Sequence, residues 1–98
     1  MDSVCKLITR TFSNDDYGIQ RETEVEKTVF CDVSSISASE FFDASQTGLK
    51  PDLRFILYFK EYSGEGLVKY KGEYFSVYRT YLRNRDYIEL YTQRDVGT

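Results

Sequence analysis

Residues 67–82, LVKYKGEYFSVYRTYL, contain two runs of apolar, aromatic and β-branched side chains, separated by Lys71-Gly72. Runs of this kind favour strands, and a two-residue interval that ends in glycine favours a tight turn between them. The stretch therefore predicts a β-hairpin. Because Asn-Gly is the usual pair for a type I′ turn, Lys71-Gly72 predicts a type I turn with Gly72 as a left-handed bulge.

Strand patterns continue on both sides of this hairpin. Upstream, residues 53–60 alternate, and one face contains the apolar side chains of Leu53, Phe55, Leu57 and Phe59. Downstream, a turn at residues 83–86 predicts a second hairpin that leads into a strand at residues 87–94. In that strand Ile88 and Leu90 share one face, and Tyr87, Glu89 and Tyr91 share the other.

The N-terminal third predicts two more strands, at residues 4–12 and 22–33, joined by an Asn/Asp-rich turn at residues 14–18. The second strand alternates. One face becomes apolar toward its end and contains Thr23, Val25, Lys27, Val29, Cys31 and Val33. The opposite face is mostly acidic. This pattern predicts a half-buried strand with one solvated side.

Residues 34–51, SSISASEFFDASQTGLKP, interrupt the strand pattern. Ser37 and Glu40 fit a capping box, in which the serine accepts a backbone bond and the glutamate reaches back to the serine N–H. They predict a short helix that Gly48 ends and Pro51 cannot continue. The segment is long for a connection in so small a domain, and such loops are usually functional or disordered.

These elements amount to about six strands and one short helix in a single domain, residues 1–98. The pattern favours an all-β fold, an antiparallel barrel or sandwich with the helix in a long loop. A chain of 98 residues buries only about 60–65% of its unfolded surface, so contacts with neighbouring subunits would add stability.

Composition excludes several classes of function. The chain has no His, two Cys without a Cys-x-x-Cys pair, and 13 Lys+Arg against 16 Asp+Glu. Without histidine there is no Ser–His–Asp or Cys–His catalysis, and the commonest zinc ligand is missing. We expect no enzyme activity, no cofactor and no metal. We also expect no membrane partner, because no apolar stretch approaches the length of a membrane helix or a signal-peptide core.

Two sets of residues have a chemical and a structural interpretation. Glu22, Glu24 and Glu26 share one strand face, where a carboxylate row can bind a hard cation or act in acid–base chemistry. A solvated edge face that discourages aggregation is the interpretation we favour. Cys5 and Cys31 lie on two candidate neighbouring strands, and we favour two free thiols over a disulfide.

Aromatic residues are the most informative feature. Tyr78, Arg79, Tyr81 and Arg83 resemble a stacking platform for single-stranded nucleic acid, although a strand with solvent-facing arginines over tyrosine rings fits an acidic chain better. Eight of the nine tyrosines lie within residues 58–91 and occur on both faces of the predicted strands, so they cannot all be core. Tyrosine is enriched at interfaces, and the candidate interface residues are Tyr58, Tyr74, Tyr78, Tyr81, Tyr87 and Tyr91.

Ordered short blocks carry a family resemblance. They are Ile8-Thr9, Asp16-Tyr17-Gly18, Val29–Val33, Glu40-Phe41-Phe42, Gly48-Leu49-Lys50-Pro51, Arg54-Phe55, Val77–Tyr81 and Ile88–Tyr91. In this order the blocks resemble the head-closure (head–tail joining, or stopper) proteins of tailed bacteriophages and prophages of Gram-positive bacteria. The resemblance spans almost the whole chain and contains no catalytic signature.

The resemblance implies a small β-barrel that forms a ring of about twelve copies with heterologous contacts. The ring would lie below the portal and adaptor proteins, close the DNA channel after packaging, and offer a surface to the tail-joining protein. Genomic DNA would pass without sequence-specific binding. Assembly would occur in the host cytoplasm, and the product would belong to the virion. By position, residues 34–51 would form the channel loop, with Ser37, Glu40, Phe41, Phe42, Gly48 and Leu49 as its candidate residues.

Overall fold

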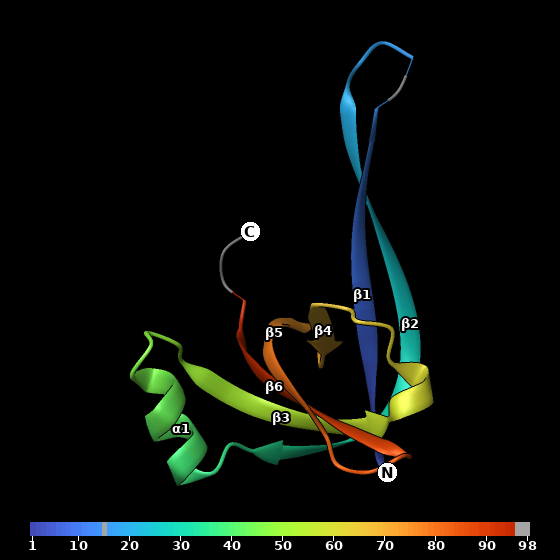
Figure 1. Cartoon of the computed structure of the whole chain (residues 1–98). Helices are drawn as coiled ribbons and strands as arrows, with labels where there is room; N and C mark the ends of the chain where they lie inside the picture. Colours follow the sequence, from blue (N-terminus) through green and yellow to red (C-terminus); the bar gives the residue numbers. More distant parts are fainter. Residues whose placement is uncertain (15, 96–98) are drawn as a thin grey trace.

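A computed structural model describes residues 1–14 and 16–95, which form six strands, one α-helix and one short 3₁₀ helix (Figure 1). The strands are β1 (Ser3–Asn14), β2 (Gln20–Ser35), β3 (Pro51–Tyr58), β4 (Leu67–Tyr70), β5 (Glu73–Leu82) and β6 (Tyr87–Arg94). The helices are α1 (Ala38–Ser45) and η1 (Phe59–Glu61). Asp15, in the predicted turn at residues 14–18, lies outside the described residues.

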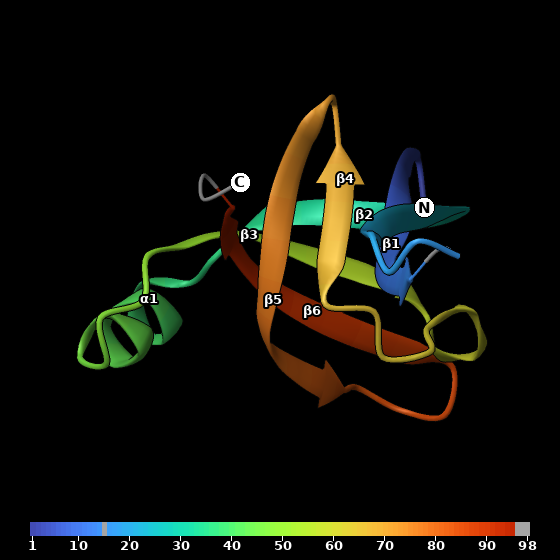
Figure 2. The same cartoon turned by 90° about the horizontal axis from the view of Figure 1, so that it is seen from above.

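All six strands belong to one antiparallel sheet with the order β1-β2-β3-β6-β5-β4. The sheet closes on itself because β4 pairs with β1, Leu67–Lys69 opposite Lys6–Ile8. Figure 2 shows β4 and β5 crossing over β3 and β6 to make this closure. The predicted all-β antiparallel fold is confirmed, in the form of a β-barrel-like structure with one short helix.

The core lies inside the closed part of the sheet. Phe55 is fully buried, and its ring meets the rings of Tyr70 and Phe75 edge-to-face, with centroids 5.5 and 5.7 Å apart. Edge-to-face pairs are worth about 0.5–1.5 kcal/mol beyond the burial of their area. Apolar residues that alternate along every strand surround this cluster: Cys5, Leu7, Val29, Cys31, Leu57, Val68, Ile88 and Leu90.

The half-buried pattern predicted for residues 22–33 is correct only at its C-terminal end. Val29 and Cys31 are buried, but residues 20–28 are exposed on both faces, and Val25 is 55% exposed. The reason is the length of the neighbouring strands. β3 reaches β2 only at Asp32–Ser35, so the first half of β2 has β1 as its only strand partner.

Two local predictions are wrong. Lys71 and Gly72 both have positive φ, 50° and 79°, and Tyr70 pairs directly with Glu73, which defines a type I′ turn rather than a type I turn with a bulge. The I′ turn matches the twist of the strands it joins. Phe59 is predicted in a strand but begins η1, because the Tyr62 N–H donates to the Phe59 carbonyl and closes a 3₁₀ turn there.

The predicted helix and its ends are confirmed. Ser37 caps α1, accepting at Oγ from the N–H of Glu40 at 3.2 Å. Gly48, with φ of 85°, ends it in a Schellman motif, in which the Leu49 N–H donates to the Ala44 carbonyl. The return bond expected from Glu40 to Ser37 is not made, because the Glu40 carboxylate contacts β5 instead. In residues 1–14 and 16–95, no helix has the length and apolarity needed to cross a membrane.

Replacement of Phe55 by alanine tests this core. We expect Phe55→Ala to lower the free energy of unfolding by about 3–5 kcal/mol, because it leaves a cavity at the centre of the aromatic cluster. Phe42→Ala is the matched control: Phe42 is 64% exposed, and its replacement should change stability by less than about 0.5 kcal/mol. Urea denaturation followed by circular dichroism measures both values. Equal losses would contradict the assigned core.

Candidate functional site: three interaction surfaces

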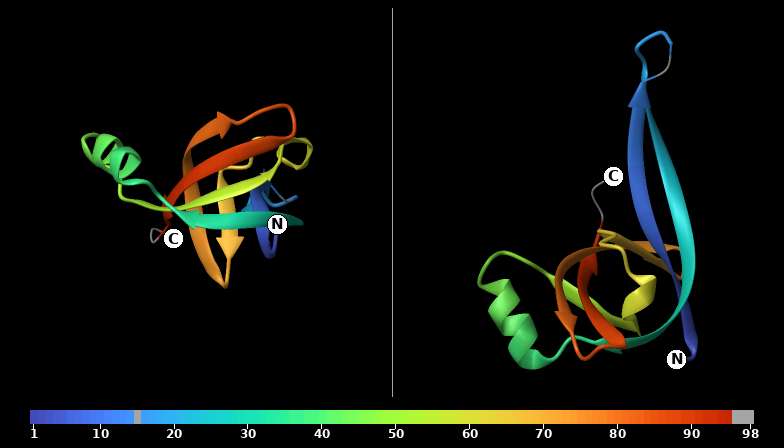
Figure 3. Two further views of the ribbon diagram at one scale, coloured as in Figure 1. Left: turned by 90° about the horizontal axis from the view of Figure 1, so that it is seen from below. Right: turned by 45° about the vertical axis from the view of Figure 1, so that its right-hand side comes forward.

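The first surface is a two-stranded arm, defined as residues 9–14 of β1 and 20–28 of β2. The arm projects well beyond the barrel in Figure 1 and in the right-hand view of Figure 3. The molecule is accordingly elongated, with extents of 50 × 30 × 23 Å. Large apolar side chains on or next to the arm are exposed, namely Phe12, Tyr17, Ile19 and Val25.

The carboxylate row predicted on β2 lies on this arm and is matched by cations. Glu22 and Glu24 lie 3.2 and 3.5 Å from the Arg10 guanidinium, and Glu26 lies 3.2 Å from the Lys6 ammonium. Within the described part of the chain, no group of three or more acidic, Cys or His residues is arranged to hold a metal ion. The row therefore has the geometry of an ion-paired, solvated strand face.

The base of the arm is braced against the barrel. The Tyr74 hydroxyl donates to Glu24 at 3.1 Å, and the Arg10 guanidinium lies 5.5 Å from the centre of the Tyr74 ring. On the other face, the Lys27 ammonium donates to the Glu61 carbonyl at 2.7 Å. These contacts hold the direction of the arm at its root, whereas farther out the ribbon of the arm stands apart from the other labelled strands and helices (Figures 1 and 3).

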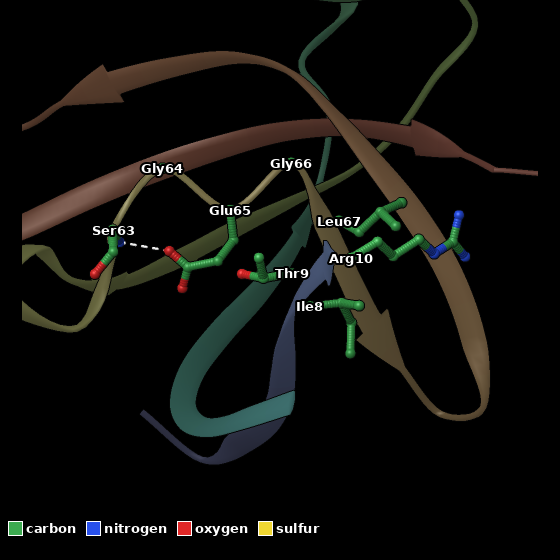
Figure 4. Close-up of a pocket in the computed structure, with 8 residues that line it drawn as sticks. All are labelled: Ile8, Thr9, Arg10, Ser63, Gly64, Glu65, Gly66 and Leu67. Carbon is green, nitrogen blue, oxygen red and sulfur yellow. Dashed lines mark hydrogen bonds between the residues drawn. The ribbon is translucent and has the colours of Figure 1, made fainter. Parts of the chain in front are cut away.

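A groove of about 380 Å³ opens beside the root of the arm, between residues 8–10 of β1 and the loop 63–67 (Figure 4). Glu65 is 9% exposed, and its carboxylate accepts from the Ser63 N–H at 2.6 Å, which closes the loop on itself. Pairing between β1 and β4 stops at Ile8 and Leu67. From Thr9 onward, the edge of β1 is therefore open.

The second surface is α1, which stands out from the side of the barrel (Figure 2). Phe41 and Phe42 are 50% and 64% exposed, and only Ala44 of this helix is buried. One side chain ties α1 to β5. The Glu40 carboxylate accepts from the Tyr78 hydroxyl at 3.0 Å and from the Arg79 guanidinium at 2.5 Å.

A bulge in β5 makes this tie possible. The register between β5 and β6 shifts between Val77 and Arg79, so Tyr78 has no direct partner and both side chains reach Glu40. Burial and the hydrogen bond to Glu40 raise the pKa of Tyr78. The phenol therefore stays protonated and keeps donating across the physiological range.

The third surface is the outer face of β3, β6 and β5, and Glu89 lies at its centre. Glu89 is 5% exposed and accepts from Arg83 at 2.8 Å, from Arg54 at 3.4 Å and from the Tyr91 hydroxyl at 2.7 Å. Arg79 lies over the Tyr91 ring, 4.1 Å from its centre. Burial works to raise the pKa of Glu89, but the bonds from Tyr91 and Arg83 and the charges of Arg83 and Arg54 outweigh it and hold that pKa below its ordinary value.

The six candidate interface tyrosines separate into three groups. Tyr58 and Tyr87 stack at 5.3 Å on the third surface, where Tyr81 is 52% exposed. Tyr91 is on the same face but is buried beneath Arg79, so it supports the surface rather than forming its outer layer. Tyr78 lies beside α1 and Tyr74 beneath the arm.

The candidate channel-loop residues have distinct places. Ser37 caps α1 and Gly48 ends it. Glu40 faces β5, and Leu49 lies half-buried in the groove between α1 and β5. Phe41 and Phe42 are the two members that present large apolar area to solvent.

The candidate nucleic-acid residues are engaged with carboxylates of the same chain. Arg79 and the Tyr78 hydroxyl bind Glu40, and Arg83 binds Glu89. A stacking platform relies on uncompensated positive charge beside open aromatic rings. Of the four residues, Tyr81 has the open ring. Binding of single-stranded nucleic acid therefore stays a prediction, and the positive charge of these residues is compensated within the chain.

The two cysteines are free thiols in the core. Cys5 and Cys31 are buried on neighbouring strands, and hydrogen bonding between them together with burial raises the pKa of Cys5. A buried thiol of raised pKa is a poor nucleophile.

Comparison with known proteins adds no relative. No model of a protein family matches the chain, and no curated protein matches it significantly.

Replacement of Glu40 tests the tie between α1 and β5. Glu40→Ala should raise hydrogen exchange of the α1 amides about fivefold, because it removes an ion pair worth about 1 kcal/mol. Asp43→Ala changes an acidic residue of the same helix that makes no contact with Arg79 and serves as the control. Unchanged α1 exchange in Glu40→Ala would show that the helix is held by other contacts.

The depressed pKa of Glu89 predicts a specific pH dependence. The folded state binds this proton less readily than the unfolded chain, so Glu89 stabilises the fold fully above its unfolded pKa of about 4.3. That stability is lost as pH falls through the lower folded value. Glu89→Gln should cost about 1–3 kcal/mol at pH 7 and much less near pH 3.

Urea denaturation at a series of pH values measures the difference between the Glu89→Gln variant and the parent chain. Glu73→Gln, on an exposed ion pair with Arg94, is the control and should have a small effect at every pH. A cost for Glu89→Gln that does not change with pH would contradict the assignment.

Proposed function

We propose that this chain is a structural, non-enzymatic subunit of the head–tail connector of a tailed bacteriophage. In this proposal a ring of subunits lies below the portal and adaptor, closes the DNA channel and presents the tail-attachment surface. The observation that carries it is the shape of the subunit. A small barrel holds out two elements, the arm and α1, on different sides, and both expose apolar side chains (Figure 3).

Two different projections suit a ring. Ring contacts are heterologous, so each subunit needs two different patches for its neighbours, and a ring within a connector also needs surfaces for the proteins above and below it. Isolated exposed apolar residues are ordinary on a protein surface, but projections that carry several of them are typical of interaction sites. A chain of 98 residues also gains more from buried subunit contacts than a larger domain does.

The net charge of the chain is consistent with a channel through which DNA passes. The net charge of the chain is −3, and Arg79 beside α1 and Arg83 on the third surface are paired with Glu40 and Glu89. A ring of such subunits carries a negative field, which limits adhesion of DNA to the channel wall. Residues 34–51, with Phe41 and Phe42 exposed, are the candidate for the segment that closes the channel.

Electron microscopy of a reconstituted portal–adaptor complex tests the proposal. Addition of the purified chain should add a ring of density below the adaptor. Phe41→Ser/Phe42→Ser should weaken this addition at least about tenfold, because each buried phenylalanine contributes about 1.5–3 kcal/mol. Phe59→Ser, at an exposed phenylalanine outside both projections, is the matched control. Absence of added density with the parent chain would sink the proposal.

A further inference from the structure

Both outer edges of the arm are open. Residues 9–14 of β1 pair with β2 alone, since β4 ends its pairing at Ile8. Residues 20–28 of β2 pair with β1 alone, since β3 begins its pairing at Asp32. Each edge therefore presents a row of backbone N–H and C=O groups, which is a template for pairing with another strand.

Apart from its charged side chains, the arm lacks the devices that protect edges in soluble proteins. Its ladder runs through twelve consecutive pairs, from Ser3 opposite Cys31 to Asn14 opposite Gln20, without a bulge. Neither β1 nor β2 contains a proline or a glycine. A ribbon of two strands is marginal in water by itself, and a third strand is normally needed for stability. An unbroken ribbon is therefore suited to pairing along its sides.

The two edges carry opposite charge. Residues 9–14 of β1 contain one cation, Arg10, and no carboxylate, which gives +1. Residues 20–28 of β2 contain three carboxylates and two cations, which gives −1: Glu22, Glu24, Glu26, Arg21 and Lys27. Pairing of two β1 edges would bring cations together, and pairing of two β2 edges would bring carboxylates together. Charge therefore favours β1 of one arm beside β2 of another.

We propose that the arm is the subunit-to-subunit connector, and that the β1 edge of one copy's arm pairs with the β2 edge of the next copy's arm. When two arms point the same way, β1 runs toward the tip and the neighbouring β2 runs back, so the new ladder is antiparallel, like the one within each arm. The contact is head-to-tail and repeats from copy to copy. Its closure into a ring rests on the proposed function, whereas the pairing itself is a property of the chain.

A second copy is the occupant that these observations select. A foreign extended peptide would cover one edge and leave the other open. A second copy supplies the complementary edge, and every arm within a continuous row has both edges covered. The exposed side chains of Phe12 and Val25 would then lie on a sheet of four or more strands rather than on an isolated ribbon.

Cysteine crosslinking between different variants tests the pairing. Thr23 of β2 faces Thr11 of β1 within one arm, and Thr9 and Ser13 lie on that same face. In one symmetric row, β1 of the next copy brings these positions beside Thr23. Mixtures of Thr23→Cys with Thr9→Cys, Thr11→Cys or Ser13→Cys are treated with a bismaleimide that spans about 8 Å, the reach of a diagonal cross-strand pair.

At least one mixture should give about tenfold more covalent dimer than either variant alone in a dilution series, because only unlike edges meet. The native Cys5 and Cys31 are 2% and 0% exposed and do not react. Thr23→Cys mixed with Lys50→Cys, an exposed position in the loop between α1 and β3, is the matched control and should give no such dimer.

Three results would overturn the proposal: no dimer in any of the three mixtures, as much dimer from Thr11→Cys alone as from the best mixture, or as much from Thr23→Cys alone. The last two would show pairing of like edges. The test needs no portal, so its outcome is separate from that of the proposed function. Crosslinks without added ring density would support pairing of the arms and contradict the connector function. Added ring density without crosslinks would support the connector function and contradict pairing of the arms.

Discussion

The pairing of β4 with β1 is the contact on which the rest of the structure depends. It comprises only three register pairs, Lys6–Ile8 opposite Leu67–Lys69, and it closes the sheet. Closure removes the sheet edges around the core and buries the cluster that surrounds Phe55. Because β4 has only four residues, closure stops at Ile8. The parts of β1 and β2 that continue beyond this point form the arm and do not belong to the barrel.

Local chemistry predicted the strands, both hairpins and the ends of α1, because each depends on a few adjacent residues. Ser37 and Gly48 act through backbone bonds within one turn of helix. The arm could not be predicted in this way. Val25 continues the alternation of Val29 and Cys31, and nothing in its own strand distinguishes an exposed position from a buried one. Its exposure is decided by where β3 and β4 end.

The contacts of the carboxylates at the second and third surfaces were not predicted, for a related reason. Glu40 fitted a capping box, and Glu89 fitted the solvated face of a strand. The sheet order places β6 between β3 and β5, which brings Arg54 and Arg83 to Glu89 from both sides. The bulge at Tyr78 brings Arg79 to Glu40. The sequence contains the arginines that make these contacts. Which arginine meets which carboxylate, however, depends on strands that are neighbours in the sheet but not in the sequence.

The division between barrel and projections also divides stability from interaction. The apolar core and the buried Glu89 network hold the closed sheet together. The arm and α1 are each fastened at one end, through Tyr74 and Lys27 or through Glu40, and expose their apolar residues beyond it. Segments with few tertiary contacts contribute little to folding alone and open at low cost. Their side chains gain free energy mainly by contact with another surface. A subunit built in this way folds as a small barrel and places about half of its exposed large apolar side chains on the elements that reach outward.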